Sequence, residues 1–365
     1  MNGALHLLLR VARWPCLLLL ACGLAHAEPY LAVQAGYRCS TCHVNPTGGG
    51  LRSQFGTVFA SRILPMNPLP AEARGWSGSM TRYLRLGADL RAAWNRSELP
   101  GGSSQQHARI DQLRAYAQAS PIPGWLSFNV DESLAPGNAR ALESYARLDL
   151  PQHGVYLKGG RFYLPFGWRL QDQTALVREA SGISMTEADK GVELGFDGEH
   201  WVASLDYTRG IANAGSGTGH QLTGQLVHVQ DRWRVGASAT HVTTLAGNRS
   251  VAGLFGGLRT GDVAWLGEAD AVSDGGYPEG TRHMVAALAE ADWRIGAGQN
   301  LKLSAEYHDP DRAIAQDQKL RWSLVYELTP LPFVQLRAGA RRYRGIPQSD
   351  VDNRRQFFVE LHAWL

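Results

Sequence analysis

The stretch KLRWSLVYEL, residues 319–328, alternates apolar and polar side chains along its whole length. Successive side chains of a β-strand point to opposite faces of its sheet, so this stretch predicts a strand with one apolar and one polar face. The apolar positions are Leu320, Trp322, Leu324, Tyr326 and Leu328. The same period of two recurs in residues 84–94 and 300–308, which indicates one kind of sheet throughout.

About sixteen such segments follow residue 80, and many are ten residues or longer. We expect them to begin near residues 80, 109, 124, 140, 153, 190, 200, 219, 232, 249, 263, 282, 299, 319, 332 and 354. Alternation also fits a water-soluble β-sandwich, but strands of soluble sheets are typically shorter. Alternating segments of about ten residues joined by turns are typical of outer-membrane barrels. The predicted fold class is therefore all-β, an antiparallel transmembrane β-barrel of about sixteen strands.

The connections between the predicted strands have two lengths. PLP (residues 330–332) and VQD (229–231) are short, whereas SELPGGSSQQ (97–106) and YRGIPQSDVDN (343–353) are longer and polar. Short turns of such barrels face the periplasm and long loops face the exterior. The last segment, residues 356–365, is an alternating apolar strand that resembles the signal recognised by the outer-membrane assembly machinery.

Charged side chains occupy the polar faces of the predicted strands. If the apolar faces contact lipid, the lumen receives Asp89, Arg91, Arg114, Glu143, Arg147, Lys158, Arg234, Lys302, Glu306, Arg321, Glu327, Arg337, Arg341 and Glu360. Both signs are present, which predicts a hydrated interior with internal salt bridges and not a strongly ion-selective pore. A barrel of this size is wide enough to leave an aqueous lumen, so it can house a short additional segment.

The N-terminus has the features of a secretory signal peptide. Arg10 and Arg13 precede an apolar run that ends in Ala25-His26-Ala27, which predicts cleavage after Ala27. Lipoprotein processing before Cys22 is the alternative. An exported barrel implies the bacterial outer membrane, with its lipid as a partner. We therefore predict a signal peptide over 1–27 and a porin-like barrel over 80–365. The motif Cys39-Ser40-Thr41-Cys42-His43 between them predicts a haem c-binding segment and linker over 28–79.

After that cleavage the chain keeps two cysteines, Cys39 and Cys42, in the motif Cys-Ser-Thr-Cys followed by His43. This spacing predicts c-type haem attachment: the two sulfurs form thioether links to the ring, and the histidine binds the iron. A thioredoxin-like pair would need a βαβ setting, and a zinc knuckle would need two more ligands. A disulfide between these cysteines would close too small a loop to stabilise much. We expect one covalent haem c, with His43 as the proximal iron ligand.

The residues after the motif suggest how the haem is covered. Gly48–Gly50 would let the backbone turn tightly and approach the ring. Five apolar residues then predict one face of a helix: Leu51, Phe55, Val58, Phe59 and Ile63. Met66 is the nearest candidate for the distal iron ligand, because a thioether can bind opposite histidine. Its alternative is packing in a proline-rich linker, with a distant histidine or an open site at the iron.

Residues 160–191 form a stretch that is longer than a hairpin loop needs. It predicts either an external flap or a loop folded inward to narrow the channel. In the inward arrangement Trp168 and Arg169 would approach the haem segment. A solvated surface loop is the alternative interpretation.

The haem motif Cys39-Ser40-Thr41-Cys42-His43 followed by a sixteen-strand pattern resembles the fused monohaem cytochrome-porins of the outer membrane, a class that includes iron-oxidising cytochromes. The resemblance implies that Cys39 and Cys42 carry the haem and that His43 is its proximal ligand. It also implies electron transfer across the outer membrane between an extracellular donor or acceptor and periplasmic cytochromes. Oxidation of ferrous iron at the cell surface is one role known in this class.

Three functions follow from these features. The first is an electron conduit that links an extracellular redox donor or acceptor to periplasmic carriers. The second is a solute-diffusion porin in which the haem segment is a plug, and the third is a haem enzyme with an open iron site and a peroxidase-like activity. Nucleic acid is excluded as a partner, because the formal charge of +3 is too small for a clustered basic face.

Overall fold

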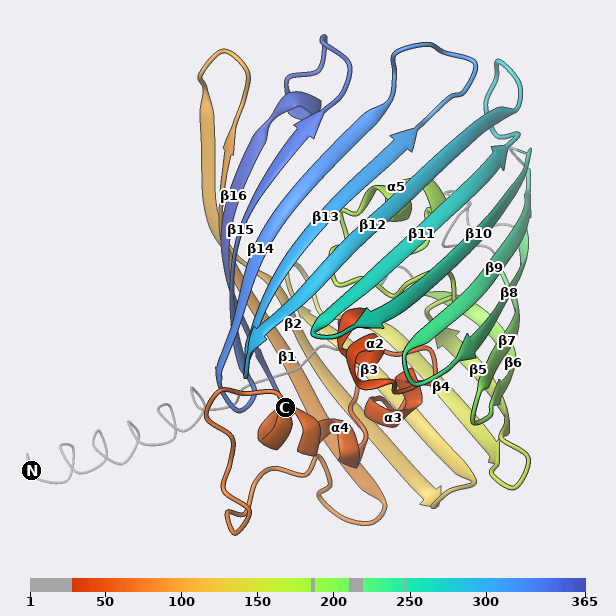
Figure 1. Cartoon of the computed structure of the whole chain (residues 1–365). Coiled ribbons are helices and arrows are strands. Elements are labelled where there is room, and N and C mark those ends of the chain that lie inside the picture. The colour runs from red at the N-terminus through yellow and green to blue at the C-terminus, as the bar shows by residue number, and fades with distance from the viewer. Residues whose placement is uncertain (1–27, 185–187, 210–218, 246) are drawn as a thin grey trace, which may run out of the picture.

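The computed structural model describes residues 28–184, 188–209, 219–245 and 247–365. Sixteen antiparallel strands form one closed barrel, in which each strand pairs with its sequence neighbours and β1 pairs with β16 (Figure 1). The strands are β1 (Leu84–Glu98), β2 (Ser104–Ile122), β3 (Leu126–Ala135), β4 (Arg140–Leu150), β5 (Val155–Phe162), β6 (Asp189–Asp197), β7 (Trp201–Thr208), β8 (Gly219–Val229), β9 (Trp233–Thr244), β10 (Gly247–Thr260), β11 (Val263–Asp274), β12 (Arg282–Gly296), β13 (Gln299–Asp309), β14 (Lys319–Leu331), β15 (Val334–Arg344) and β16 (Arg355–Trp364). The predicted barrel and its strand number are confirmed.

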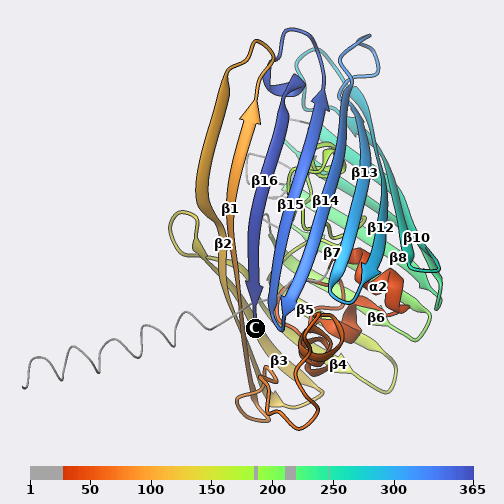
Figure 2. The same cartoon turned by 60° about the vertical axis from the view of Figure 1, so that its left-hand side comes forward.

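The strands begin within five residues of every predicted start. The largest differences are at the hairpin of β1 and β2 (Figure 2), which extends beyond β3: residues 104–112 of β2 have no partner in β3, whereas β1 pairs with β16 up to Glu98. Residues 97–106 were expected to form a long polar loop, but pairing continues to Glu98 and resumes at Ser104. Only residues 99–103 lie outside the two strands, because polar side chains at this height still permit an unbroken backbone ladder.

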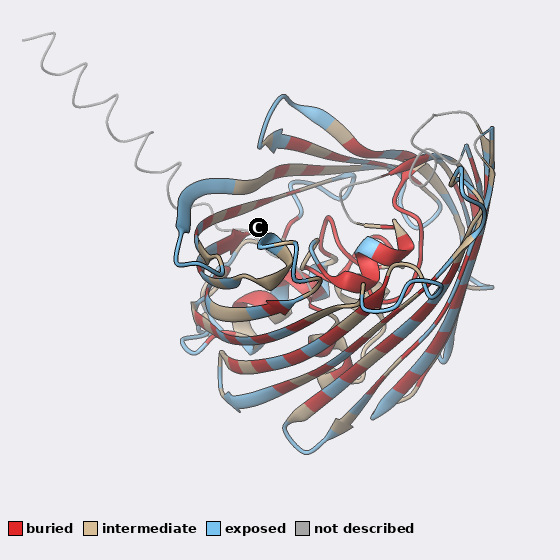
Figure 3. Ribbon diagram, turned by 90° about the horizontal axis from the view of Figure 1, so that it is seen from above, coloured by how far each residue is buried: buried red, intermediate tan, exposed pale blue. Residues whose placement is uncertain are grey.

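The outer face of the barrel is apolar. On β14, Trp322 and Leu324 are 43% and 49% exposed, whereas Arg321 and Ser323 beside them are buried. The alternation of buried and exposed bands runs along most strands (Figure 3). A closed barrel with an apolar exterior satisfies every backbone group internally and can be solvated by lipid. Among the described residues, no helix is both long and apolar enough to cross a bilayer.

Charged side chains fill the lumen and pair with each other, as predicted. Lys158 Nζ lies 2.8 Å from a carboxylate oxygen of Glu193, and both side chains are fully buried. Arg114 Nη1 lies 3.2 Å from Asp131. Buried charges of this kind require partners, because removing an ion from water without compensation is costly. The interior is therefore a set of ion pairs, with both signs represented.

In the connection between β5 and β6, the described residues 163–184 fold into the lumen and carry helix α5 (Leu176–Ser181), as Figures 1 and 3 show. Arg178 Nη2 lies 2.7 Å from both carboxylate oxygens of Glu268 on β11. The backbone N–H of Leu176 donates to Glu306 on β13 (2.7 Å). Of the alternatives for this stretch, the inward loop is correct. The external flap and the solvated surface loop are wrong. The Arg178 side chain and the backbone N–H of Leu176 both bind carboxylates on the inner wall of the barrel.

The segment before β1 crosses the inner mouth of the barrel, at the end where the short turns and the C-terminus lie (Figure 2). Its elements are α2 (Pro29–Ala35), α3 (Cys39–Cys42), α4 (Gln54–Val58) and the π-helical turn η2 (Phe59–Ile63). The predicted signal peptide, 1–27, lies outside the described residues. A further 3₁₀ turn, η3 (Val351–Asn353), lies between β15 and β16.

The predicted helical face over residues 51–63 is only partly correct. A helix does form, with Ser53 as its N-cap, but it consists of α4 followed by η2. Its small residues are buried, whereas Phe55 and Ile63 are 37% and 55% exposed. The reason is close packing: a Cβ added to Gly56 would lie 2.1 Å from the carbonyl oxygen of Cys42. Gly56 therefore packs against Cys42, and Phe55 and Ile63 stay exposed, whereas Leu51 is buried.

Candidate haem-attachment site

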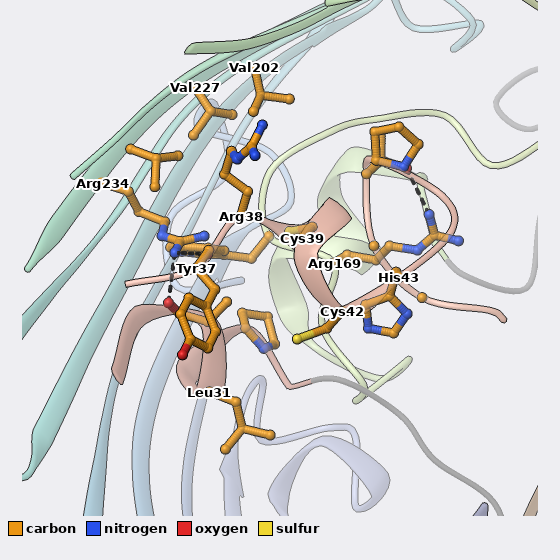
Figure 4. Close-up of a pocket in the computed structure, with 18 of the residues that line it drawn as sticks. Leu31, Tyr37, Arg38, Cys39, Cys42, His43, Arg169, Val202, Val227 and Arg234 are labelled. Atoms are coloured by element: carbon orange, nitrogen blue, oxygen red, sulfur yellow. Dashed lines mark hydrogen bonds between the residues drawn. The ribbon is translucent and has the colours of Figure 1, made fainter. Parts of the chain in front are cut away.

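A cavity lies at the inner mouth, between the N-terminal segment, the inward loop and the wall strands β7–β10 (Figure 4). It contains about 1030 Å³ of space between atoms, part of it open to solvent. Its lining residues are Glu28, Pro29, Leu31, Ala32, Tyr37, Arg38, Cys39, Cys42, His43, Pro46, Thr47, Gly48, Gly49, Arg52, Phe59, Gly167, Trp168, Arg169, Val202, Gln225, Val227, Val229, Arg234 and Phe255. The cavity thus contains all three residues of the predicted attachment motif.

Helix α3 places Cys39 and Cys42 on one turn, and the backbone N–H of His43 closes that turn on the carbonyl of Cys39 (2.9 Å). The turn between β6 and β7 holds this helix from the barrel side. Arg38 Nη1 and the hydroxyl of Ser40 both lie 3.0 Å from Oδ1 of Asp197. The motif is therefore fixed to the wall by polar contacts on either side of the first cysteine.

His43 is 2% exposed, and neither ring nitrogen makes a well-aligned hydrogen bond among the described residues, although the backbone of Gly49 and Gly50 lies close to the ring. Burial lowers the pKa of this imidazole well below its usual range, and the positive charges of Arg52 and Arg169 lower it further. A lowered pKa favours the neutral ring, which has a lone pair available. A buried polar group without a partner is rare in proteins and calls for an explanation, which a bound iron would supply.

The two thiols are free, and burial raises the pKa of both. Among the described residues, no three Cys, His, Asp or Glu side chains converge as ligands of a metal ion. In a c-type haem site the two cysteine sulfurs would bind the edge of the porphyrin and the histidine would bind the iron at its centre, so the three side chains need not converge on one point. The ligands of a zinc ion must converge on the metal. Together with the unpartnered imidazole and the cavity, the donor set fits a covalently attached haem.

Gly48, Gly49 and Gly50 adopt the positive-φ backbone conformation that the predicted tight turn requires. Gly48, Gly49 and Gly50 have φ values of +90°, +72° and +62°, which side chains rarely tolerate. A Cβ at Gly49 would lie 2.9 Å from Nε of Arg169, and one at Gly48 would lie 3.6 Å from Sγ of Cys39. This tight turn brings the backbone against the cysteine and leaves room for Arg169.

The inward loop contributes Trp168 and Arg169 to the cavity, as its inward interpretation predicted. Arg169 Nη1 donates to the hydroxyl of Thr47 (2.9 Å). The indole N–H of Trp168 donates to the carbonyl of Gly267 (3.0 Å), and its ring meets Phe255 edge to face at 5.1 Å. The loop therefore forms the wall of the cavity that faces the barrel interior.

Met66 does not line the cavity. Its backbone N–H donates to the carbonyl of Thr329 at the end of β14 (2.9 Å), and the residue is 42% exposed. The structure does not bring it together with His43, because the chain after η2 turns toward the barrel rim at Gly298. Packing at the end of the linker, the alternative interpretation, describes this environment. His43 is the only histidine among the lining residues, and no methionine is among them.

Arg52 and Arg234 also line the cavity, and sequence reasoning did not assign either to the site. Arg234 was expected to face the lumen, since it alternates with outward side chains of β9. Its position near the mouth was not predictable without the pairing of the strands. Arg52 lies two residues after the glycine turn. Because that turn was expected to approach the haem, its position in the sequence was the one signal that could have assigned Arg52 to the site.

No family model and no curated protein sequence matches the chain. Solved structures do match in fold. OmpT of Vibrio cholerae in its trimer form matches with a TM-score of 0.62 at 12% identity, over 78% of this chain and 100% of that chain. An anion-selective porin from Comamonas acidovorans gives 0.61 at 11% identity, over 77% and 98%. The outer membrane channel DcaP of Acinetobacter baumannii gives 0.56 at 13% identity, over 76% and 96%.

These matches confirm the fold of an outer-membrane porin-like barrel. With the apolar outer face, that fold indicates the bacterial outer membrane as the location and its lipid as a partner. At these identities the likeness concerns the fold alone. Haem attachment and membership in the cytochrome-porin class stay predictions.

Proposed function

We propose that this chain is a haem c protein that passes electrons through the outer membrane, between an extracellular donor or acceptor and periplasmic carriers. The observation that supports this most is the juxtaposition of Cys39, Cys42 and the unpartnered ring of His43 in one cavity inside the barrel mouth. Lipid insulates, so a redox centre held within a protein wall provides a route that the bilayer lacks.

Each residue of the motif has a defined task in this proposal. Cys39 and Cys42 would form the thioether links, and His43 would bind the iron with a ring nitrogen. Haem c, when bound, supplies one-electron chemistry. The inward loop, through Trp168, separates the cavity from the rest of the lumen, and Tyr37 and Phe59 border it at the mouth. The chain's contribution is thus to fix the group's position and to limit its contact with water.

The proposed reaction transfers one electron at a time from a donor to an acceptor. An extracellular reductant loses one electron and a periplasmic carrier gains one, or the reverse, with no bond formed or broken in the protein. Ferrous iron is a reductant of suitable chemistry, since its oxidation is a one-electron step. The periplasmic partner would dock at the inner mouth, where Phe55 and Ile63 are exposed.

A solute-diffusion porin is the second candidate, and the fold favours it. The matched structures include an anion-selective porin and an outer membrane channel. Two parts of this chain oppose free diffusion: the N-terminal segment crosses the inner mouth, and the loop carrying α5 occupies the lumen above it. Conductance therefore separates the two candidates.

The decisive experiment begins with haem staining and visible spectra of outer-membrane fractions from cells that make wild-type protein, Cys42→Ala or Ser40→Ala. We expect covalent haem in the wild type and in Ser40→Ala, which changes the same helix without removing a thiol, and loss of stain in Cys42→Ala. Purified wild-type protein is then placed in liposomes that enclose an electron acceptor.

Electron transfer from an external reductant to that acceptor, absent with Cys42→Ala, would support the conduit. A wild-type band without haem would overturn the proposal. Open-channel currents in planar bilayers, with haem present but without electron transfer across liposomes, would instead establish the diffusion porin.

A further inference from the structure

We infer that Arg52 and Arg234 bind the two propionate carboxylates of the haem, and so act as positioning residues that also tune its potential. This inference rests on the proposed function, since it assigns residues to the same cofactor. The proposed function assigns residues to the thioether links and to the iron, and this inference assigns residues to the propionates.

Arg52 is a buried cation with no acidic partner in the described part of the chain. It is 5% exposed, and its Nε has no hydrogen-bond partner among the described residues. No carboxylate oxygen in the described part of the chain lies within ion-pair distance of it. Asp89, whose charge acts on Arg52 from further away, is bound by Gln112 (2.6 Å) and Arg91 (3.7 Å). Arg52 lies opposite His43 in an isolated β-bridge, so its position relative to the motif is fixed.

Arg234 is buried in the same cavity, on the wall strand β9. It is 4% exposed, and its Nη2 donates to two backbone carbonyls, those of Ala32 (2.8 Å) and Tyr37 (2.5 Å). Within the described ranges it has no carboxylate partner either. The two carbonyls hold the guanidinium group in place at the cavity wall (Figure 4), and they compensate its charge only in part.

The other two arginines of the cavity already have acidic partners. Arg38 Nη1 lies 3.0 Å from Asp197, and Arg169 Nη2 lies 3.9 Å from Glu143. The single carboxylate among the lining residues, Glu28, is held by Lys302 (3.1 Å). No acidic group that lines the cavity is therefore left for Arg52 or Arg234.

Charge counting then identifies the ligand chemistry. Buried cations are stable when they are paired and hydrogen-bonded, and guanidinium groups suit carboxylates because they donate two parallel hydrogen bonds. The cavity offers two such cations without acids, and haem carries two carboxylates. A neutral occupant would leave both charges without compensation, so a dianionic one fits better.

The test compares reduction potentials of purified holoprotein by optical redox titration. In Arg52→Gln and Arg234→Gln, covalent haem should remain, because the thiols and His43 are unchanged. The midpoint potential should shift to more negative values in each, and further in the double variant, since removing a positive charge near the iron favours its oxidised form. Arg52→Lys and Arg234→Lys keep the charge and should retain most of the wild-type potential.

Arg38→Gln is the matched control: it changes a cavity arginine that already has a carboxylate partner, and its shift should be smaller. Shifts of equal size in Arg38→Gln and the two test variants would overturn the inference while the proposed function stands. So would a wild-type potential in the double variant. If the wild type carries no haem at all, the proposed function itself fails. A glutamine variant that does not fold is replaced by the lysine variant, which keeps the charge but not the two parallel hydrogen bonds. Its loss of contact should appear as a shifted propionate vibration in the resonance Raman spectrum, and an unshifted vibration would overturn the inference.

Discussion

Lys302 Nζ of β13 lies 3.1 Å from Oε2 of Glu28, with both side chains almost fully buried. This ion pair joins the first described residue of the N-terminal segment to the inner wall of the barrel. Arg337 on β15 approaches the same carboxylate at 3.7 Å, and the hydroxyl of Tyr30 donates to Glu327 (2.8 Å). The segment is therefore anchored in the lumen by charge as well as by packing.

Breaking this anchor should release the segment. In Lys302→Met the carboxylate of Glu28 loses its closest cation, and removing one partner of a buried pair typically costs about 3–5 kcal/mol. We expect limited proteolysis to cleave between residues 28 and 79 faster in the variant, while the barrel core stays resistant. Glu28→Gln combined with Lys302→Met should be milder, because Glu28 then carries no charge that lacks its cation, although Glu290 and Asp292 lose Lys302 in both variants. Equal cleavage of the single variant and the wild type would contradict the anchor.

The inward loop should control ion flow. In Arg178→Gln the pair with Glu268 is lost, and Glu268 also accepts the backbone N–H of Trp168 (2.9 Å). A loosened loop opens the lumen, so single-channel conductance in planar bilayers should rise several-fold. Arg282→Gln alters an exposed pair and should leave the conductance unchanged. Unchanged conductance in Arg178→Gln would show that the loop does not limit the current.

The anchoring of the loop by Asp172 should survive mild acid. Burial by itself would raise the pKa of this carboxyl group, but Arg321, Arg341 and hydrogen bonds from Thr174 hold it well below its usual range. A lowered pKa in the folded state means that the stabilisation is complete above the ordinary pKa of about 3.9 and is lost as pH falls through the lower, folded value.

We therefore expect the conductance difference between wild type and Asp172→Asn to stay constant from neutral pH down to the ordinary pKa range of aspartate. Below that range the difference should shrink. A loss of the difference already near pH 6 would contradict the pairing of Asp172 with the two arginines.

The glycine turn should be intolerant of side chains at one position in particular. Gly49→Ala adds a Cβ 2.9 Å from Nε of Arg169 and also strains a backbone with φ +72°. The backbone strain costs on the order of 1 kcal/mol, and the contact displaces Arg169 in addition. The ratio of haem to protein should fall, as measured by absorbance.

Gly101→Ala has the same kind of backbone strain, with φ +82°, but no atom lies within 4 Å of its added Cβ. It is the matched control and should retain normal haem content. Equal losses in both variants would assign the effect to stability alone.

Met66→Ala should leave the haem absorption bands of the holoprotein unchanged, since Met66 lies at the barrel rim and not in the cavity. Substituting an iron ligand alters those bands. A changed spectrum would show that the linker rearranges to bring Met66 to the iron.

The barrel was predictable because its periodicity is local. On β14 alternate side chains face lipid and lumen, so the alternation of apolar and polar residues in 319–328 is enough to predict which face each side chain occupies. The partners of the lumenal charges were less predictable. Asp172 and Arg178 come from the inward loop and Glu28 from the N-terminal segment, where no alternation exists to show which way a side chain points.

The motif itself was predictable from spacing, but its surroundings were not. Cys39, Cys42 and His43 are neighbours in sequence, whereas Arg234 and Trp168 join them through the tertiary fold. The apolar residues after the motif were expected to bury one face of a helix. Periodicity could not show that the small residue Gly56 would pack against Cys42 and leave Phe55 outside.

The way the barrel closes sets an order for its biogenesis. The end of β16 seals the cylinder: the N–H of Trp364 donates to Phe333, and that of Leu365 donates to Ala88 on β1. Trp364 and Leu365 are made and exported long after Cys39 and Cys42, which lie close to the predicted signal peptide. Under the proposed function, the enzymes that attach haem to Cys39 and Cys42 would therefore act in the periplasm, before the barrel inserts into the membrane and closes.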